Sequence, residues 1–263
     1  MDGFKNFKAQ AVIFDKDGTL IDFDVMWGGW VVYLAGQLNA ASGLNVEEPF
    51  YVAMGYDHEH RKVLAGGRLA SRPMAQLRHL TIEVMQSFGL NMDQAEQIVE
   101  QAWCIPDPVI LAKPLTDIRT LFSQFHSQKI KIGIATADDR APTQAMIEAF
   151  DVEEFISTMA CGDDGIKAKP APDMVLAICK GMKIDPAGTM VIGDTVADLK
   201  MARAAGAGLV VGVLSGVSSA RDLVSYADVL IESVDELHAY AHGLAGNISA
   251  QGSHNDLNPD FAF

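Results

Sequence analysis

Two aspartates, Asp15 and Asp17, stand two residues apart where a short apolar run ends. The run begins at Ala11 and predicts a buried strand, and Asp17-Gly18 is a typical turn signal. Because alternate residues of a strand project to the same side, both carboxylates can enter one pocket, and we expect Lys16 to point away from it. Paired carboxylates at a strand end suit nucleophilic attack and general acid–base work. An Asp-x-Asp-Gly turn that only ends a strand would use the same residues.

A hydroxyl and a cation occupy two later positions of the same kind. Thr136 follows an apolar run, 130–135, so its hydroxyl would lie at a strand end and could donate to a phosphoryl oxygen. A threonine that caps a helix is the alternative. Lys169 precedes a proline and a helix that we expect to begin at Pro172. Its ammonium could balance carboxylate and phosphate charges, although many loop lysines are simply solvated.

Two further carboxylates complete the set. Asp194 ends the apolar run 189–192, which predicts a strand, and Asp198 lies in the first turn of the next expected helix, 196–205. The helix dipole alone favours a carboxylate in that turn. The chemical interpretation is a metal site in which Asp194 coordinates a hard cation and Asp198 is a direct or indirect ligand. Oxygen ligands with retained waters suit Mg²⁺.

The elements that must position these residues alternate between strand and helix. The expected strands are the run at Ala11, 130–135, 155–160, 189–192, 208–213 and 228–231, and the expected helices are 116–127, 142–150, 172–180, 196–205 and 234–240. This alternation predicts an α/β fold, a doubly wound, Rossmann-like parallel sheet covered on both faces. Ligands bind beyond the carboxyl ends of the strands in such sheets, so the side chains above would meet at one edge.

The stretch 22–108 separates the first motif from this alternating part and has no convincing strand pattern. Its apolar residues recur at helical spacing in three segments, the second after Pro73 and the third opening on Asp93 as a possible N-cap. We therefore expect an all-helical insertion, here called the cap. The expected division is a core of residues 1–21 and 109–242, a cap of residues 22–108 and a poorly ordered tail of residues 243–263.

Composition narrows the class of partner. The chain has 34 acidic and 20 basic residues and a formal net charge of −14, which argues against nucleic acid and against an anionic membrane surface. No apolar run reaches membrane-spanning length. The three cysteines lack metal-site spacing and favour a reducing, cytoplasmic setting with free thiols. A small anionic substrate fits this composition if a metal ion or local cations overcome the negative potential of the chain. The sequence leaves open whether the protein is a monomer or a homodimer.

Together these residues resemble the four motifs of the haloacid dehalogenase-like hydrolase superfamily. Four strand ends deliver Asp-x-Asp, Thr, Lys and Gly-Asp-x-x-x-Asp in that order. The stretches 169–173 and 193–198 most resemble the branch of phosphoglycolate phosphatase and β-phosphoglucomutase, which carries a helical cap after the first motif. The likeness covers residues 11–20 and about 116–237. Lys16 departs from the pattern, since its position is often apolar.

The resemblance implies a two-step phosphoryl transfer. Asp15 would attack the phosphoryl group and form an aspartyl-phosphate, which splits a difficult displacement into two easier ones. Asp17 would protonate the leaving alcohol and then deprotonate the attacking water. Mg²⁺ would be held by Asp15, Asp194 and the backbone carbonyl of Asp17, with Asp198 as a direct or indirect ligand. The groups that would stabilise the phosphoryl oxygens are Thr136, Lys169 and backbone N–H groups near Gly18.

The cap would then select the substrate, since a mobile lid contacts the part of the substrate that does not react. Arg61 and Arg68 are our candidates for substrate binding, and a cation there would suit a carboxylate such as that of phosphoglycolate. Most charged side chains in the stretch 55–72 could equally well only be solvated. We expect Trp27 and Trp30, at the entrance of the cap, to belong to its apolar core rather than to a substrate platform.

Three functions fit these residues. The first is a Mg²⁺-dependent phosphatase of small phosphomonoesters, and the second is a phosphomutase of the β-phosphoglucomutase type, in which a substrate hydroxyl replaces water. The third is a non-enzymatic module that binds or responds to phosphorylated ligands, because a fold alone does not determine function. A dehalogenase fits less well, because that chemistry needs neither an acid–base group at Asp17 nor a metal.

Overall fold

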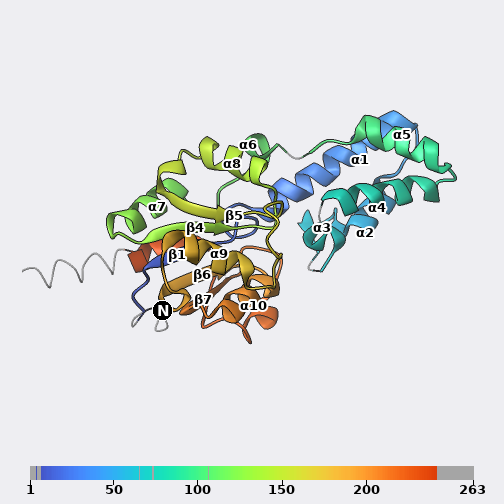
Figure 1. The fold of residues 1–263 in the computed structure, drawn as a ribbon. Helices are drawn as coiled ribbons and strands as arrows, with labels where there is room; N and C mark the ends of the chain where they lie inside the picture. Colours follow the sequence, from blue (N-terminus) through green and yellow to red (C-terminus); the bar gives the residue numbers. More distant parts are fainter. Residues whose placement is uncertain (1–3, 5–6, 65, 73, 106, 242–263) are drawn as a thin grey trace, which may run out of the picture.

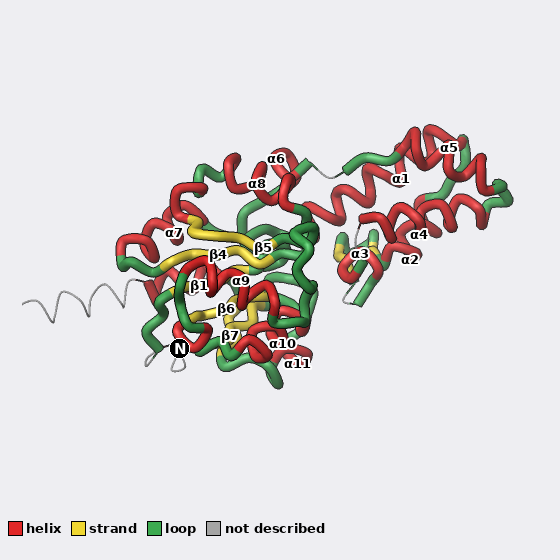
Figure 2. Tube along the Cα trace, viewed as in Figure 1, coloured by secondary structure: helices red, strands yellow, loops and turns green. Residues whose placement is uncertain are grey.

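The computed structural model describes residues 4, 7–64, 66–72, 74–105 and 107–241. Figure 1 shows an α/β body joined to an elongated helical body, and Figure 2 shows the strands gathered in the first, with one small pair in the second. The predicted tail, 243–263, and the predicted helix start at Pro73 lie outside the described residues.

Six parallel strands of the described chain form the sheet of the core, in the order β5-β4-β1-β6-β7-β8. They are β1 (Ala11–Phe14), β4 (Lys131–Ala135), β5 (Ile156–Ala160), β6 (Thr189–Gly193), β7 (Leu209–Val213) and β8 (Val229–Ile231). The chain builds outward from β1 first on one side and then on the other, so the strand order reverses at β1. Such a reversal opens a crevice at the carboxyl ends of the strands.

Helices cover both faces of this sheet, as predicted. On one face α7 (Ile118–Ser127) and α8 (Arg140–Ala149) pack against Val12 and Phe14, and on the other α9 (Asp173–Met182) and α10 (Val196–Ala205) pack against Ala11 and Ile13. All four β1 residues are fully buried, because a central parallel strand has apolar neighbours on both sides. The short helices α6 (Pro108–Leu111) and α11 (Ala220–Leu223) complete the core, and the expected last helix begins as a 3₁₀ turn, Val234–Glu236.

The cap has an apolar cluster of its own, formed by residues between Trp30 and Ala102. Its elements are a π-helical turn η2 (Asp24–Gly28), α1 (Gly29–Ser42), α2 (Glu47–Met54), β2 (Tyr56–Asp57), β3 (Lys62–Val63), α3 (Arg68–Ser71), α4 (Met74–Ser87) and α5 (Met92–Ala102). The chain leaves and re-enters the core side by side, since the Asp22 N–H donates to the Lys113 carbonyl at 2.9 Å. The division of the chain at residues 22 and 108 stays our proposal.

Two predictions about the cap were wrong. It is not all-helical, because β2 and β3 form an antiparallel hairpin in which Tyr56 pairs with Val63. Two residues per strand are too few to produce the alternation by which a strand is recognised in a sequence. The N-cap of α5 is Asn91 rather than Asp93, and its side chain forms a capping box with Gln94.

In the part of the chain that the structure describes, no helix is both long enough and apolar enough to cross a bilayer.

Candidate active site

Lys169 joins two carboxylates at the end of the sheet. Its ammonium lies 2.5 Å from Asp15 Oδ1 and 2.6 Å from Asp198 Oδ1, and all three side chains are almost completely buried. Asp15 directly follows β1, and its backbone N–H donates to the Ile192 carbonyl of β6 at 2.9 Å. A buried charge is stable only when it is paired in this way. Asp15, Lys169 and Asp198, which are far apart in the sequence, therefore lie together at the carboxyl ends of the strands. The alternation of strands and helices predicted this position.

The two carboxylate oxygens of Asp198 have different partners, one at the start of α10 and the other in the site. Its Oδ2 accepts hydrogen bonds from the Thr195 backbone N–H and hydroxyl, as part of a capping box at the start of α10. Its Oδ1 faces Lys169. A Cβ on Gly193 would lie 2.4 Å from the Asp198 Cβ, so β6 must end in glycine for the helix to begin this close.

Asp194 lies in a cradle made by two glycines. A Cβ at Gly18, whose φ is +83°, would lie 2.6 Å from Asp194 Oδ2, and a Cβ at Gly216 would lie 2.0 Å from the same atom. This oxygen accepts a hydrogen bond from the Val217 N–H at 2.9 Å. The other oxygen, Oδ1, is buried and has no hydrogen-bond partner among the described residues. A buried carboxylate oxygen without a hydrogen-bond partner costs folding free energy unless a bound ligand supplies the missing contact.

The carboxylates of this edge fit a divalent cation. One ligand oxygen of each of Asp15, Asp194 and Asp198 lies within 4.8 Å of the others. Burial, followed by the like charges of Asp15 and Asp198, holds the pKa of Asp194 well above its usual range. Burial also raises the pKa of Asp15, although Lys169 opposes this. The cluster has more negative charge than Lys169 balances, and its hard oxygen donors are those that cations such as Mg²⁺ prefer.

Asp17 is positioned by different partners. The Lys16 ammonium lies 2.8 Å from Asp17 Oδ2 and 3.0 Å from Oδ1, and the Trp27 indole N–H donates to Oδ1 at 3.0 Å. The side chain of Asp17 does not belong to the three-carboxylate cluster, although its charge is close enough to help raise the pKa of Asp15. The structure is therefore compatible with a metal contact through its backbone carbonyl rather than its carboxylate.

The prediction that Lys16 points away from these residues was wrong. Lys16 is fully buried, and its ammonium also lies 2.9 Å from Asp138 Oδ2. Burial disfavours the charged form, but Asp17 and Asp138 outweigh it and raise the pKa of Lys16. The long, flexible lysine stem lets the ammonium return to the carboxyl end of the strand, which strand alternation alone does not reveal.

Trp27 and Trp30 differ in their surroundings. Trp30 is 1% exposed within the apolar cluster of the cap, as predicted. Trp27 packs against the cap cluster, as predicted, but it also packs against a core cluster and donates to Asp17, which the sequence did not reveal. It stands on η2, the π-helical turn where the chain enters the cap; such turns are frequent at functional sites.

Thr136 begins the loop after β4. Its N–H donates to the Ala160 carbonyl at 3.0 Å, and its hydroxyl oxygen accepts a hydrogen bond from the Asp138 N–H at 3.0 Å. The following helix has Asp139 as its N-cap, so Thr136 is not a helix cap. Its own O–H is the group that would donate to a phosphoryl oxygen.

Among the described residues, the two cap arginines form no ion pair with the carboxylates. Arg61 is exposed in the turn of the hairpin, at a φ of 54°, and Arg68 is exposed at the first position of α3, with Nη1 3.4 Å from the Ala53 carbonyl. Figure 1 shows α3 and the hairpin on the side of the cap that faces the core. Their roles in binding stay predictions.

One part of the site was missed in the sequence. The loop after β7 supplies the Ser215 hydroxyl, which donates to the Gly18 carbonyl at 2.8 Å, together with Gly216 and Val217 of the Asp194 cradle. The Ser-Gly pair, one residue beyond the predicted strand 208–213, was the available signal, since it marks a turn at the edge where ligands bind.

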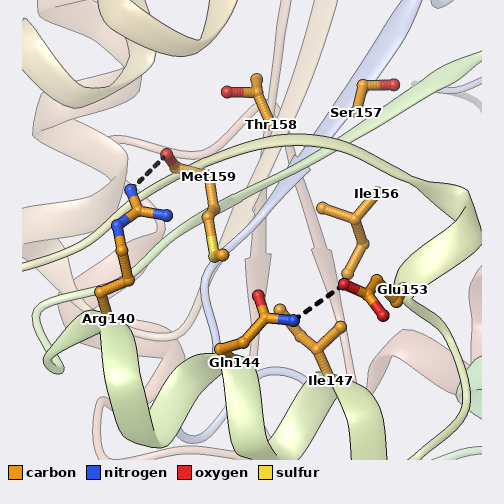
Figure 3. Close-up of a pocket in the computed structure, with 8 residues that line it drawn as sticks. All are labelled: Arg140, Gln144, Ile147, Glu153, Ile156, Ser157, Thr158 and Met159. Carbon is orange, nitrogen blue, oxygen red and sulfur yellow. Dashed lines mark hydrogen bonds between the residues drawn. The ribbon is translucent and has the colours of Figure 1, made fainter.

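A pocket of 310 Å³ lies away from these residues, between α8 and the edge strand β5 (Figure 3). Arg140 donates to the Met159 carbonyl at 3.2 Å, and Gln144 donates to Glu153 at 3.0 Å across it. None of the predicted site residues lines this pocket, so it is separate from the carboxylate cluster.

The chain is similar in sequence to known proteins. The model of the haloacid dehalogenase-like hydrolase family matches residues 9–206. The N-acetylmuramic acid 6-phosphate phosphatase of Pseudomonas aeruginosa is 24% identical over 210 residues, which are 77% of this chain and 80% of that protein. The phosphoglycolate phosphatase of Escherichia coli is 32% identical over 111 residues, or 41% of this chain and 43% of that one.

Among solved structures, a putative β-phosphoglucomutase from Thermotoga maritima superposes with a TM-score of 0.63 at 19% identity, covering 90% of this chain and 98% of that one. This likeness shows the fold. The family match covers most of the chain, so the protein belongs to the haloacid dehalogenase-like hydrolase family. Within that family, its phosphatase relatives identify it as a phosphoric monoester hydrolase.

Proposed function

We propose that the protein is a Mg²⁺-dependent phosphatase that hydrolyses a small phosphomonoester through an aspartyl-phosphate on Asp15. The observation that supports this most directly is the buried cluster of Asp15, Lys169, Asp194 and Asp198 at the carboxyl end of the central strand. It offers a nucleophile, a cation for the phosphoryl group and a set of metal ligands in one place.

The first step needs an oxygen of Asp15 free to attack. Lys169 holds Oδ1 at 2.5 Å, whereas the nearest partner of Oδ2 among the described residues is the Thr19 hydroxyl at 3.5 Å. We infer that Oδ2 forms the new bond to phosphorus while the bond from phosphorus to the alcohol oxygen breaks. Lys169 then compensates the charge that collects on the phosphoryl oxygens, and the Thr136 hydroxyl donates to one of them.

Asp17 would move the protons of both steps. It gives a proton to the departing alkoxide, so that the product leaves as an alcohol. It then takes a proton from the water that attacks the aspartyl-phosphate, which regenerates Asp15 and releases inorganic phosphate. Acid–base help of this kind contributes about 10²–10⁴-fold to a rate.

Asp15 and Asp194 would hold the metal ion, with Asp198 acting through Lys169. A bound Mg²⁺ supplies positive charge against the phosphoryl oxygens and the carboxylates. The orphaned Asp194 Oδ1 and the surplus of buried negative charge support this assignment.

The substrate class is suggested by the relatives and by the cap. Their names refer to N-acetylmuramic acid 6-phosphate and phosphoglycolate, an amino-sugar acid phosphate and a two-carbon acid phosphate. Both compounds carry a carboxylate, and we propose that Arg61 or Arg68 binds that group when the cap approaches the core. Both arginines are exposed, and the hairpin and α3 that carry them lie on the side of the cap nearer the core, which supports this role.

Phosphate release from a panel of small phosphomonoesters tests the proposal, with Mg²⁺ and with chelator. The panel should contain phosphoglycolate, hexose phosphates and amino-sugar phosphates. Release that requires Mg²⁺ supports it, and the best substrate defines what the cap binds. An isomerised sugar phosphate in place of inorganic phosphate would instead indicate a phosphomutase. Tight binding of phosphorylated ligands without turnover would indicate a binding module.

A further inference from the structure

Lys16 joins the acid–base residue to the loop that carries the threonine hydroxyl. Its fully buried ammonium lies 2.8 Å from Asp17 Oδ2 and 2.9 Å from Asp138 Oδ2. We propose that Lys16 is a positioning residue, which sets the orientation of Asp17 and the place of the Thr136 loop through one ammonium. This role rests on the proposed phosphatase activity, and it reaches the reacting atoms only through those two neighbours.

The link to Thr136 runs through Asp138, whose polar groups hold the loop together. The Asp138 N–H donates to Thr136 Oγ1 at 3.0 Å, its Oδ1 accepts from the Asp139 N–H at 2.9 Å, and its carbonyl accepts from the Gly162 N–H at 2.8 Å. Lys16 holds the remaining oxygen, Oδ2. A shift of Asp138 would therefore move the Thr136 hydroxyl.

The link to Asp17 is equally direct. Lys16 contacts both carboxylate oxygens, and Trp27 shares Oδ1 with it. Trp27 stands on η2 where the chain enters the cap, whereas Lys16 belongs to the core, so Lys16 would stay with Asp17 even if the cap moved. A proton can be delivered only by a carboxyl group that points at the leaving oxygen.

Packing alone does not account for a lysine here. The side chain is buried to 0% exposure, and desolvating an ammonium costs several kcal/mol unless its partners compensate. An apolar residue of similar length would fill the same space without that cost. The positive charge of Lys16 is therefore explained by the two carboxylates that it contacts rather than by packing.

The test compares Lys16→Met with the parent on two kinds of substrate. With an alkyl phosphomonoester we expect kcat to fall about 10²-fold, the size of effect that a misplacement of about 1 Å produces, while KM changes less than about twofold. With p-nitrophenyl phosphate we expect a smaller loss, because its leaving group departs without a proton. Lys131→Met is the matched control. Lys131 is the first residue of β4, at the end of that strand away from Thr136, and its ammonium donates to the Met182 carbonyl. This variant should keep the parent kcat.

Asp138→Asn tests the second link and leaves no buried charge unpaired, because Lys16 keeps Asp17. We expect kcat to fall about tenfold on both kinds of substrate alike, since this change loosens Thr136 rather than Asp17. The combined variant should lose less than the product of the two single losses, because both act through one ammonium.

Several results would overturn the role of Lys16. The first is an unchanged kcat for a folded Lys16→Met variant, and the second is an equal loss of kcat on both substrates for that variant. If Lys16→Met fails to fold, an unchanged kcat for Asp138→Asn overturns the role instead. A parent chain without turnover overturns the proposed phosphatase and the positioning role with it. An active parent matched by equally active variants overturns the positioning role alone.

Discussion

Replacing Asp194 by Asn should stabilise the metal-free protein and impair the enzyme at the same time. Asp194 is fully buried beside two other carboxylates, and its Oδ1 has no hydrogen-bond partner among the described residues. The amide keeps an oxygen for the Val217 N–H and has nearly the same shape. It places an NH₂ group at the position of Oδ1, where it removes one negative charge and cannot bind a cation.

The size of the effect follows from this burial. Replacing a buried, poorly compensated charge by a neutral group of the same shape stabilises a protein by about 1–3 kcal/mol. For a chain of this size each kcal/mol raises Tm by about 2–4 °C, so we expect a rise of about 2–12 °C in chelator. The loss of a metal ligand should raise the Mg²⁺ concentration for half-maximal activity by about 100-fold or more.

Thermal unfolding in chelator and a Mg²⁺ titration of phosphate release measure the two effects. Asp228→Asn is the matched control, because Asp228 also binds a backbone N–H, that of Val210, but pairs its other oxygen with Arg203 at 2.7 Å. That variant should lose up to about 1 kcal/mol and keep its Mg²⁺ requirement. A lower Tm in chelator for Asp194→Asn, or an unchanged Mg²⁺ requirement, would refute the metal assignment.

Three further outcomes follow from the site. Asp15→Asn should abolish phosphate release and leave the circular dichroism spectrum unchanged; surviving turnover would remove Asp15 as nucleophile. Gly18→Ala should cost about 1–2 kcal/mol of backbone strain at its φ of +83° and weaken Mg²⁺ binding, since the new Cβ would press on Asp194; a Tm and Mg²⁺ affinity equal to the parent's would contradict this geometry. The Tm gain from Mg²⁺ should grow between about pH 5 and about pH 8. The raised pKa values of Asp15 and Asp194 mean that the metal-free fold keeps protons that the unfolded chain loses, so its stability falls as pH rises through this window, while the cation binds better. A gain independent of pH would show that these carboxylates do not hold the metal.

The core could be predicted from the sequence because its signals are local and repeated. Mostly apolar strand runs alternate with helices, and at four places a carboxylate, hydroxyl or lysine follows the strand or precedes the helix. The parallel topology then brings Asp15, Lys169 and Asp198 within hydrogen-bond distance. The spacing of these three residues along the chain does not by itself show that they lie close together, so the prediction depended on the predicted sheet.

The features that were missed depend on contacts between distant parts of the chain. Lys16 was misplaced because strand alternation describes where a side chain starts and not where a four-carbon stem ends. Trp27 looked like one more apolar residue of a helix, and only its approach to the core gives the indole N–H a partner. The hairpin at Tyr56 was too short for a periodic pattern. Gly216 was marked by a turn signal, but its contact with Asp194 required the fold.

Trapping the phosphoryl group on Asp15 tests the central claim most directly. The enzyme is quenched with acid during turnover of its best substrate with Mg²⁺, reduced with borohydride, and digested for mass spectrometry. Borohydride converts an aspartyl-phosphate to homoserine, so the account predicts homoserine at position 15 in the turnover sample and unmodified Asp15 without substrate. Phosphate release in the same sample with homoserine at another position, or at none, would contradict it.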